Sequence, residues 1–290
     1  MSKPSLSVIL ITKNEEFHVG NAIDNVKDIA EEIFVVDSGS TDKTVEIAVS
    51  KGAKVLFHAF EGFGKQWNWA LDNCPIKTVW TMKMDPDERL TERLKAELAV
   101  ALRQEVASAF AFDRVLWFMG KRLSHMRNRV LRIWKTGQCR FTDVAVNEHP
   151  KVVGKCAVLS GEMDHYDSQN LHHWVMKQNH YSSLEAQRIF EGGQLAAQPK
   201  LMGDALQRRM WVKRLFFNLP GRYLLLFLYY YFGKLLFIDG RAGYYFTYLR
   251  IWTWKMREAK VCEMRNRQAS MAVTSESPTS SISARTKNAP

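Results

Sequence analysis

Short runs of consecutive apolar residues alternate with longer amphipathic segments over the first 105 residues. A short apolar run between polar residues is typical of a strand buried on both faces, and apolar residues three or four apart are typical of a helix. The predicted strands are residues 7–11, 33–36, 54–57 and 78–84. The predicted helices are residues 15–28, with Asn14 as N-cap, and 43–51, 63–73 and 94–103. This alternation predicts an α/β fold with a mostly parallel central sheet and helices on both faces.

The pattern changes after residue 108, where shorter apolar segments are separated by turn residues. We expect three of these segments to be strands that extend the sheet, namely residues 109–112, 130–134 and 151–159. Residues 170–194 again predict a helix, and 201–260 predict a largely helical appendage rich in aromatic and basic residues. The last segment, 268–290, is rich in Ser, Thr, Ala and Pro and is predicted to be disordered. The predicted parts are an α/β domain (1–165), a helical region (166–266) and a tail (267–290).

Basic residues are concentrated in one part of the chain. The formal net charge is +11, and residues 200–267 contain 14 Lys and Arg against 4 Asp and Glu, a balance of +10. Such a surplus indicates nucleic acid, an anionic membrane surface or a phosphorylated substrate as a partner, or a solvated basic face with no partner.

Cysteine spacing and hydropathy exclude several classes of protein. The four cysteines form no CxxC pair, so we expect neither a zinc site nor a disulfide framework, and we expect a reducing compartment. Residues 1–7 lack the apolar stretch of a signal peptide. There is no run of about 20 apolar residues, so we expect no obvious membrane-spanning helix.

Polar clusters follow all four predicted parallel strands. They are residues 12–15, 37–42, 58–64 and 85–88. Ligands of an open parallel sheet bind beyond the carboxyl ends of its strands, so these clusters should converge in space. Taken singly, each cluster also fits a helix cap or a turn, as at Asn14, Ser40 or Gly62.

The last of these clusters carries the clearest chemistry. Asp85 and Asp87, with Glu88 beside them, crowd the end of an apolar strand. Their mutual repulsion costs free energy unless a cation or hydrogen bonds compensate for it. Oxygen-rich clusters suit Mg²⁺ or Mn²⁺, which bind through a few carboxylates and substrate phosphates. The cluster therefore predicts a divalent cation that bridges a diphosphate and stabilises it as a leaving group.

Motifs at these positions resemble those of a known family. TKNE follows the first predicted strand, VVDSGSTDKT begins in the second, and Asp85 and Asp87 form an Asp-x-Asp. Together they resemble the inverting glycosyltransferases of family 2, which have the Rossmann-like GT-A fold. FHAFEGFGKQWNWAL (57–71), VNEHP (146–150) and FIDGRAGYYF (237–246) are similar to segments of the lipopolysaccharide-core glycosyltransferases of Gram-negative bacteria. That subgroup is typified by the β-1,4-glucosyltransferase acting on inner-core heptose, and the resemblance covers about residues 5–260.

The resemblance implies a role for each matching position. Asp37 should hydrogen-bond the base, expected to be uracil, Asp85 should face the ribose or the metal, and Asp87 should hold the Mg²⁺ or Mn²⁺ ion on the diphosphate. The other implied pocket residues are Thr12, Asn14, Glu15, Ser38, Ser40, Gly62, Gly64, Gln66 and Asn68. An inverting transfer also needs a general base, which in this family is an acid after the Asp-x-Asp; Glu148 and Asp143 are the candidates.

The sequence departs from the family's pattern at four positions. Pro86 replaces a common Ala, Lys83 stands where an apolar or small residue is usual, Trp67 replaces a basic residue, and Asn147 replaces a His. Pro86 removes a backbone donor but leaves both carboxylates usable. The departures leave the donor sugar open.

Four histidines, at positions 165, 172, 173 and 180, fall in an amphipathic context without a complete chelating set. We do not expect a zinc site there, and we interpret two or more of the histidines as surface or acceptor-groove residues.

Residues 210–260 combine dense aromatic residues with flanking Lys and Arg, and Pro and Gly interrupt their apolar stretches. This composition is typical of helices at a membrane interface, and it also fits a helical subdomain that packs on the main domain. We expect the protein to be cytoplasmic and peripherally associated with the inner membrane, where a lipid-linked glycan acceptor is reached.

The predicted function is transfer of a sugar, glucose by the resemblance, from a UDP-sugar to a lipid-linked acceptor such as the lipopolysaccharide inner core. A transferase for another envelope glycan is the alternative. Binding of single-stranded nucleic acid through the basic aromatic segment is a further alternative, but we expect no nucleic-acid partner. No known nucleic-acid module is present, and the acids at the strand ends would repel phosphates in the absence of a metal.

Overall fold

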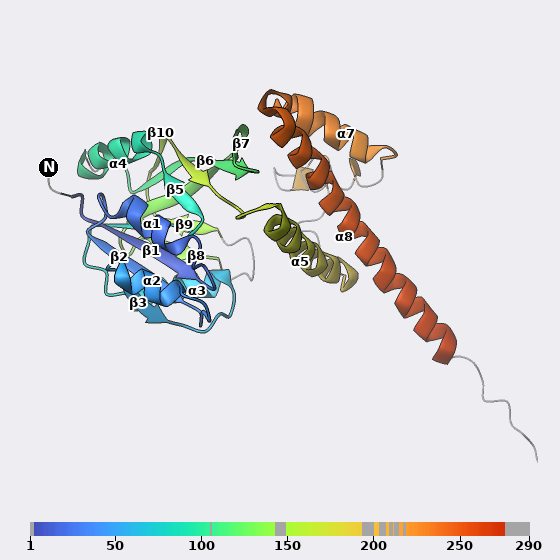
Figure 1. The fold of residues 1–290 in the computed structure, drawn as a ribbon, viewed down its shortest axis with the longest axis horizontal. Coiled ribbons are helices and arrows are strands. Elements are labelled where there is room, and N and C mark those ends of the chain that lie inside the picture. The colour runs from blue at the N-terminus through green and yellow to red at the C-terminus, as the bar shows by residue number, and fades with distance from the viewer. Residues whose placement is uncertain are drawn as a thin grey trace, which may run out of the picture. The chain divides into compact units, whose positions relative to one another are not determined.

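A computed structural model of the chain describes residues 3–104, 106–142, 149–192, 200–202, 207–208, 211, 215–216 and 219–275. The chain divides into two compact units, Met1–Trp174 with Tyr230–Phe246, and Val175–Tyr229 with Thr247–Pro290. The first unit contains the β-sheet (Figure 1). The predicted division at residues 165 and 266 concerns the roles of the parts and stays a prediction.

An eight-stranded sheet forms the centre of the first unit, in the order β3-β2-β1-β4-β7-β6-β10-β5. Its strands are β1 (Leu6–Thr12), β2 (Glu32–Asp37), β3 (Lys54–Phe57), β4 (Trp80–Lys83), β5 (Glu88–Leu90), β6 (Ala109–Phe118), β7 (Lys121–Lys135) and β10 (Cys156–His165). β1, β2, β3 and β4 are parallel, β7 is antiparallel to β4 and β6, β10 is parallel to β6, and β5 is antiparallel to β10. A small second sheet pairs β8 (Cys139–Phe141) with β9 (Pro150–Val152). The predicted α/β fold is confirmed.

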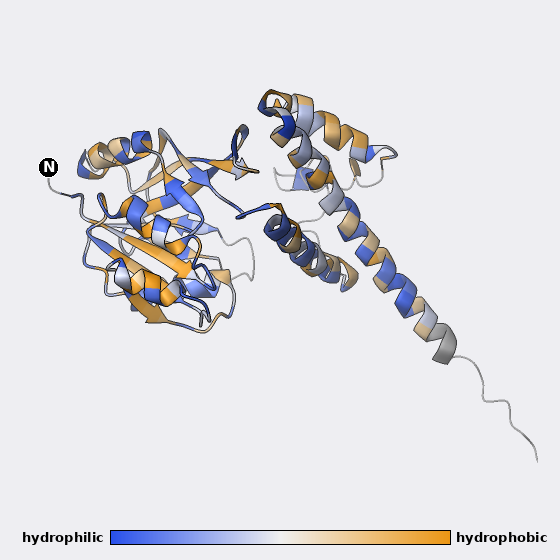
Figure 2. Ribbon diagram, in the orientation of Figure 1, coloured by the Kyte–Doolittle hydropathy of each residue, from blue (hydrophilic) through white to orange (hydrophobic). Residues whose placement is uncertain are grey.

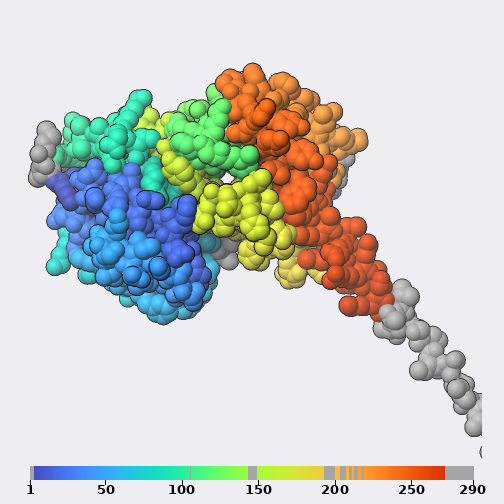
Figure 3. Space-filling model, in the orientation of Figure 1, coloured from blue at the N-terminus to red at the C-terminus, as the bar shows by residue number. Residues whose placement is uncertain are grey.

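Helices cover both faces of the sheet, and β1 shows why. All seven of its residues are buried, and their side chains alternate between two hydrophobic clusters. Leu6, Val8 and Leu10 pack in one cluster with helices α1, α2 and α4, whereas Ile9 and Ile11 pack in the other with α3. The helices are α1 (Val19–Val26), α2 (Thr44–Ser50), α3 (Phe63–Asn73) and α4 (Glu92–Gln104). Figure 2 shows β1 as hydrophobic over most of its length, and in Figure 3 the residues coloured blue to green pack closely.

Several local features differ from the sequence predictions. The strand predicted at 151–159 is two strands, β9 and β10, which belong to different sheets. Gly154 lies between them with a φ of +103°, a left-handed conformation that interrupts an extended strand. The strand predicted at 130–134 is the end of the longer β7, and β5 was not predicted. Helix α1 begins at Val19 and is not capped by Asn14, whose side chain instead accepts a hydrogen bond from the Thr41 N–H.

The second unit is held together by polar contacts between parts of α5 (Leu171–Phe190) and α8 (Gly240–Ser275). The Lys260 ammonium donates hydrogen bonds to oxygens of Asn179, Ser182 and Ser183 at 2.7–2.8 Å. These bonds satisfy its donors at several points on one face of α5. Helix α8 continues to Ser275, so it enters the segment from Gln268 that was predicted to be disordered. The remainder of that segment lies outside the described residues.

The described chain directly before α8 consists of one short helix and two irregular turns. Helix α7 (Arg222–Leu228) is followed by a π-helical turn, η1 (Tyr229–Gly233), and by a 3-10 turn, η2 (Leu236–Asp239). None of the described helices is by itself both long and apolar enough to cross a bilayer; Arg222–Gly233 and Leu236–Met271 meet that test only as a bent pair.

Candidate active site

The site lies at the edge of the sheet where the parallel strands end. Register places Thr12 of β1 opposite Asp37 of β2, and β4 ends beside β1, just before Asp85. Since β7 is antiparallel to β4 and β6, and β10 is parallel to β6, β10 runs in the same direction as β4. Its last residue, His165, therefore reaches the same edge. Residues far apart in the sequence meet there, as expected from the polar clusters that follow the predicted parallel strands.

Asp37 organises the loops that follow β1 and β2. One carboxylate oxygen accepts hydrogen bonds from the backbone N–H groups of Gly39 and Ser40, both at 2.8 Å. The other accepts from the hydroxyls of Thr12, at 2.9 Å, and Ser40. A carboxylate that accepts several hydrogen bonds is strongly oriented, so Asp37 fixes the shape of the loop. That it also bonds a nucleotide base stays a prediction.

The TKNE loop is fastened to the loop after β2 and to the start of α2 by several further hydrogen bonds. The Asn14 backbone N–H donates to the Ser40 hydroxyl at 2.8 Å, and the Asn14 side-chain oxygen accepts from the Thr41 N–H at 2.9 Å. The Glu15 N–H donates to the Thr44 hydroxyl at 2.7 Å. Asn14 has a φ of +55°, a left-handed conformation that Asn tolerates better than most residues. The two loops therefore form one rigid wall beside the strand ends.

Helix α3 contributes a second wall. Gln66 is buried, donates to the Ser38 hydroxyl at 3.0 Å, and its oxygen lies 2.7 Å from His58 Nδ1. Gly64 is buried in the first turn of the same helix. Asn68 faces a different neighbour, because its amide donates to the Phe141 carbonyl at 3.0 Å and accepts from the Phe141 N–H at 2.9 Å. Asn68 thus holds the end of β8 against α3.

A buried ion-pair network supports the Asp-Pro-Asp turn. Glu88 is fully buried; it accepts a hydrogen bond from Arg114 at 3.0 Å and another from Arg132, and its second oxygen accepts from the Asp85 N–H at 2.9 Å. The Arg132 guanidinium also donates to the Asp85 carboxylate at 2.8 Å. Burial raises the pKa of Asp85, but the combined attraction of Arg132, Lys83 and Arg114 outweighs burial and holds that pKa below its usual value. Asp85 is therefore kept ionised and directed at Arg132.

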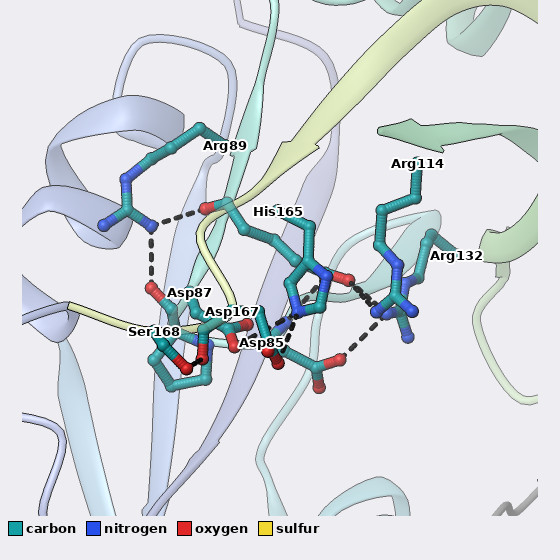
Figure 4. A network of polar contacts seen from close by, with 10 residues as sticks. Asp85, Asp87, Arg89, Arg114, Arg132, His165, Asp167 and Ser168 are labelled. Carbon is teal, nitrogen blue, oxygen red and sulfur yellow. Dashed lines mark hydrogen bonds and ion pairs between the residues drawn. The ribbon is translucent and has the colours of Figure 1, made fainter. Parts of the chain in front are cut away.

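A second cluster lies next to this network and can hold a cation. Asp87, His165 and Asp167 each place one ligand atom within 4.8 Å of the others. His165 Nε2 lies 3.2 Å from the Asp87 carboxylate and 3.9 Å from that of Asp167 (Figure 4). Burial lowers the pKa of His165, but the Asp87 carboxylate outweighs burial and raises that pKa above its usual value. The cluster therefore favours a positive charge between its carboxylates.

The donor set of this cluster fits Mg²⁺ or Mn²⁺. Carboxylate oxygens are the ligands that both ions prefer, and the imidazole nitrogen suits Mn²⁺ better than Mg²⁺. Asp85, predicted as a second metal residue, does not belong to the cluster that the described residues form, and it contacts Arg132 instead. His165, one of the four histidines noted in the sequence, has a largely buried side chain beside Asp87.

Two predicted site residues lie outside the described part of the chain. Asp143 and Glu148, the two candidates for the general base, fall outside the described residues. Sequence reasoning did not name Arg132 or Asp167, and it included neither Glu88 nor His165 among the predicted site residues. The sequence did indicate that Glu88 needs a cationic partner. Three acids lie within four positions there, and their repulsion requires nearby cations.

The sequence profile of glycosyl transferase family 2 matches residues 7–166, which include every residue of this site except Asp167. The chain belongs to glycosyl transferase family 2. Two relatives of this transferase are an uncharacterized glycosyltransferase of Rickettsia typhi, 29% identical over 73% of this chain and 76% of that protein, and LpsC of Rhizobium meliloti. LpsC is a lipopolysaccharide core biosynthesis glycosyltransferase, 30% identical over 66% of this chain and 74% of its own length. A solved structure of S. aureus TarS 1–349 with UDP-GlcNAc overlaps 86% of this chain and 90% of its own, at 15% identity and a TM-score of 0.40.

Two departures of this family 2 transferase from the family's pattern contact each other. The Lys83 ammonium is buried 4.5 Å from the centre of the Trp67 ring and 5.3 Å from that of Phe141. A cation over an aromatic face is attracted to it, so each departure stabilises the other. Pro86 keeps the turn in place, because its carbonyl accepts a hydrogen bond from Arg89 at 2.7 Å.

Proposed function

We propose that this transferase moves a hexose, glucose by its likeness to the core glucosyltransferases, from a UDP-sugar to a lipid-linked glycan with inversion at the anomeric carbon. The observation that carries the proposal is the cluster of Asp87, His165 and Asp167 beside the rigid wall of residues 12–15 and 37–44. It supplies a cation site for a diphosphate where a parallel sheet binds its ligands. Membership of family 2 supplies the reaction class.

Different residues around this edge would contact different parts of the nucleotide-sugar donor. Thr12, Asn14, Glu15, Asp37, Ser38 and Ser40 would line the nucleoside pocket, and Gly64 and Gln66 would form its floor. Asp85, held by Arg132, would direct its second oxygen to the ribose. Asp87, His165 and Asp167 would hold a Mg²⁺ or Mn²⁺ ion, which when bound would neutralise the charge that develops on the diphosphate.

Inversion requires a single displacement. A hydroxyl oxygen of the acceptor forms a bond to the anomeric carbon as the bond from that carbon to the UDP oxygen breaks on the opposite face. A carboxylate, Glu148 or Asp143, takes the hydroxyl proton, and the bonding electrons leave with UDP. The hydrogen bonds between Asn68 and Phe141 support this assignment, since they anchor the chain that leads to both acids beside α3.

The acceptor is inferred from likeness and charge. LpsC is named for lipopolysaccharide core biosynthesis. The basic balance of +10 in residues 200–267 favours an anionic surface or substrate. We propose the inner-membrane surface on the cytoplasmic side as the place of reaction, with another envelope glycan as the alternative acceptor.

A transfer assay tests the proposed function. The purified full chain is incubated with Mn²⁺ or Mg²⁺, a panel of UDP-sugars, and truncated lipopolysaccharide core as the acceptor. We expect release of UDP from one donor, dependent on the metal, and a product whose new linkage has the opposite anomeric configuration to the donor. A product with retained configuration would overturn the inverting mechanism. No turnover of any donor by the folded protein, with any truncated core, would contradict the proposed substrates.

A further inference from the structure

Residues 230–246 of the first unit form a surface that the proposed chemistry does not use, and it is called here the aromatic wedge. Large apolar side chains project from it into solvent, with Phe232 53% exposed and Ile238 58% exposed. The other exposed apolar side chains of the wedge are Leu235, Phe237, Tyr244 and Tyr245. Burying such side chains against a partner is favourable, and a gathering of six in 17 residues marks an interaction surface.

The wedge is rigid, although it is made of irregular turns. Leu235 and Gly240 both adopt left-handed backbone conformations, with φ of +54° and +63°, which turn the chain sharply at each end of η2. A Cβ atom on Gly243 would collide with the Leu236 carbonyl oxygen, so α8 and η2 approach as closely as a glycine allows. The motif FIDGRAGYYF therefore encodes a fixed projection.

The wedge is anchored on the hairpin between β6 and β7. The Lys121 ammonium donates a hydrogen bond to the Asp239 carbonyl at 2.9 Å, and Phe118 packs edge to face against Phe246. Leu116, two residues before Phe118, pairs in register with His165 of the metal cluster. The same hairpin therefore carries the wedge at its end and borders the candidate active site.

The charges of the wedge suit an anionic partner. Lys234 and Arg241 lie among its aromatic residues, and the only acid, Asp239, is buried. Burial raises the pKa of Asp239. Aromatic residues with interspersed Lys and Arg are typical of the headgroup region of a bilayer, where rings enter the interface and cations meet anionic lipid. Helix α7, directly before the wedge in the chain, has no buried residue and is largely hydrophobic in Figure 2.

We propose that the aromatic wedge inserts into the surface of an anionic lipid bilayer and holds the active-site edge next to it. The proposal deepens the proposed function by naming the part of the chain that meets the membrane. It is measured without donor or acceptor, so the two can fail independently.

Vesicle binding by the full chain tests this proposal. Sedimentation compares vesicles of phosphatidylethanolamine with phosphatidylglycerol against vesicles of phosphatidylcholine alone. We expect the wild type to prefer the anionic vesicles, and the variant Phe232→Ser/Ile238→Ser to bind them about tenfold or more weakly, since two side chains no longer enter the interface. The matched control, Val100→Ser/Val153→Ser, removes equally exposed apolar side chains elsewhere and should bind like the wild type.

Two further measurements keep the outcomes distinct. The thermal midpoint and Mn²⁺-dependent UDP binding of the wedge variant should match those of the wild type, because the altered side chains are exposed. Failure of the wild type to bind anionic vesicles, or wild-type binding by the wedge variant, would overturn the proposal. If the wild type were a dimer that bound no vesicles, and the wedge variant were a monomer, the proposal would be overturned. The partner of the wedge would then be a second copy of the chain. Vesicle binding without UDP binding would instead count against the proposed function alone.

Discussion

Replacing Asp87 by Asn should lower kcat for sugar transfer by about a thousandfold, because a divalent ion contributes several kcal/mol to stabilisation of the departing diphosphate. Asn keeps the size of the side chain but removes the charge that lies 3.2 Å from His165 Nε2. The loss should appear in kcat at saturating donor, and more metal should restore it only in part. Steady-state rates of UDP release over a series of Mn²⁺ concentrations measure the effect.

Asp28→Asn provides the matched control for this change. Asp28 is an exposed acid that pairs with Lys95 at 3.4 Å on the surface of the same unit, so its replacement should leave kcat unchanged. If Asp87→Asn turned over donor at the wild-type rate with saturating metal, Asp87 would not hold the ion that assists the reaction.

Replacing Arg132 by Met should lower the free energy of unfolding by about 3–5 kcal/mol, the usual loss when one member of a buried ion pair is removed. The Arg132 side chain is only 7% exposed and neutralises both Asp85 and Glu88, and Glu88 is fully buried. Without Arg132, Glu88 would have to take up a proton or stay ionised in the interior with Arg114 as its remaining cation. Urea unfolding monitored by circular dichroism measures the change.

Two further variants distinguish the effect of breaking the buried ion-pair network from the effect of removing any arginine. Arg129→Met removes an arginine from the same strand that pairs with Asp113 at the surface, and should cost about 0–1 kcal/mol. Adding Glu88→Gln to Arg132→Met should recover part of the lost stability, because the uncompensated buried charge is removed with its partner. A loss below about 1 kcal/mol for Arg132→Met alone would mean that the network does not stabilise the turn.

The regular part of the fold was predictable because its signals are local. The apolar runs that became β1 and β2 are short, buried and bounded by polar residues, and the α3 prediction of 63–73 matches the helix bounds. The strand-end rule then brought Thr12, Asp37 and Asp85 to one edge without knowledge of any contact. The position of the loops around Asp37 was therefore predictable, but the hydrogen bonds that hold these loops were not.

The second half of the site was not predictable from local pattern. His165 reaches the edge only because β10 pairs in parallel with β6 and β7 reverses between β4 and β6, and no short segment encodes that pairing. Arg132 likewise sits on β7, 44 residues from Glu88. A one-residue change of register would turn its side chain to the other face, so its role depends on the whole sheet. The predicted strand at 151–159 was split for a different, local reason. The left-handed backbone of Gly154 interrupts the extended chain despite the apolar pattern around it.

Calorimetric titration of UDP into the full chain tests the central claim, that Asp87, His165 and Asp167 hold the ion that binds the donor. The titration is made with Mn²⁺ and with a chelator, on the wild type, on His165→Ala, and on His172→Ala, which changes an exposed histidine of α5. We predict that UDP binds the wild type and His172→Ala only when Mn²⁺ is present, and that His165→Ala binds about 10–100-fold more weakly. Equal UDP affinity with the chelator, or wild-type affinity in His165→Ala, would contradict the account.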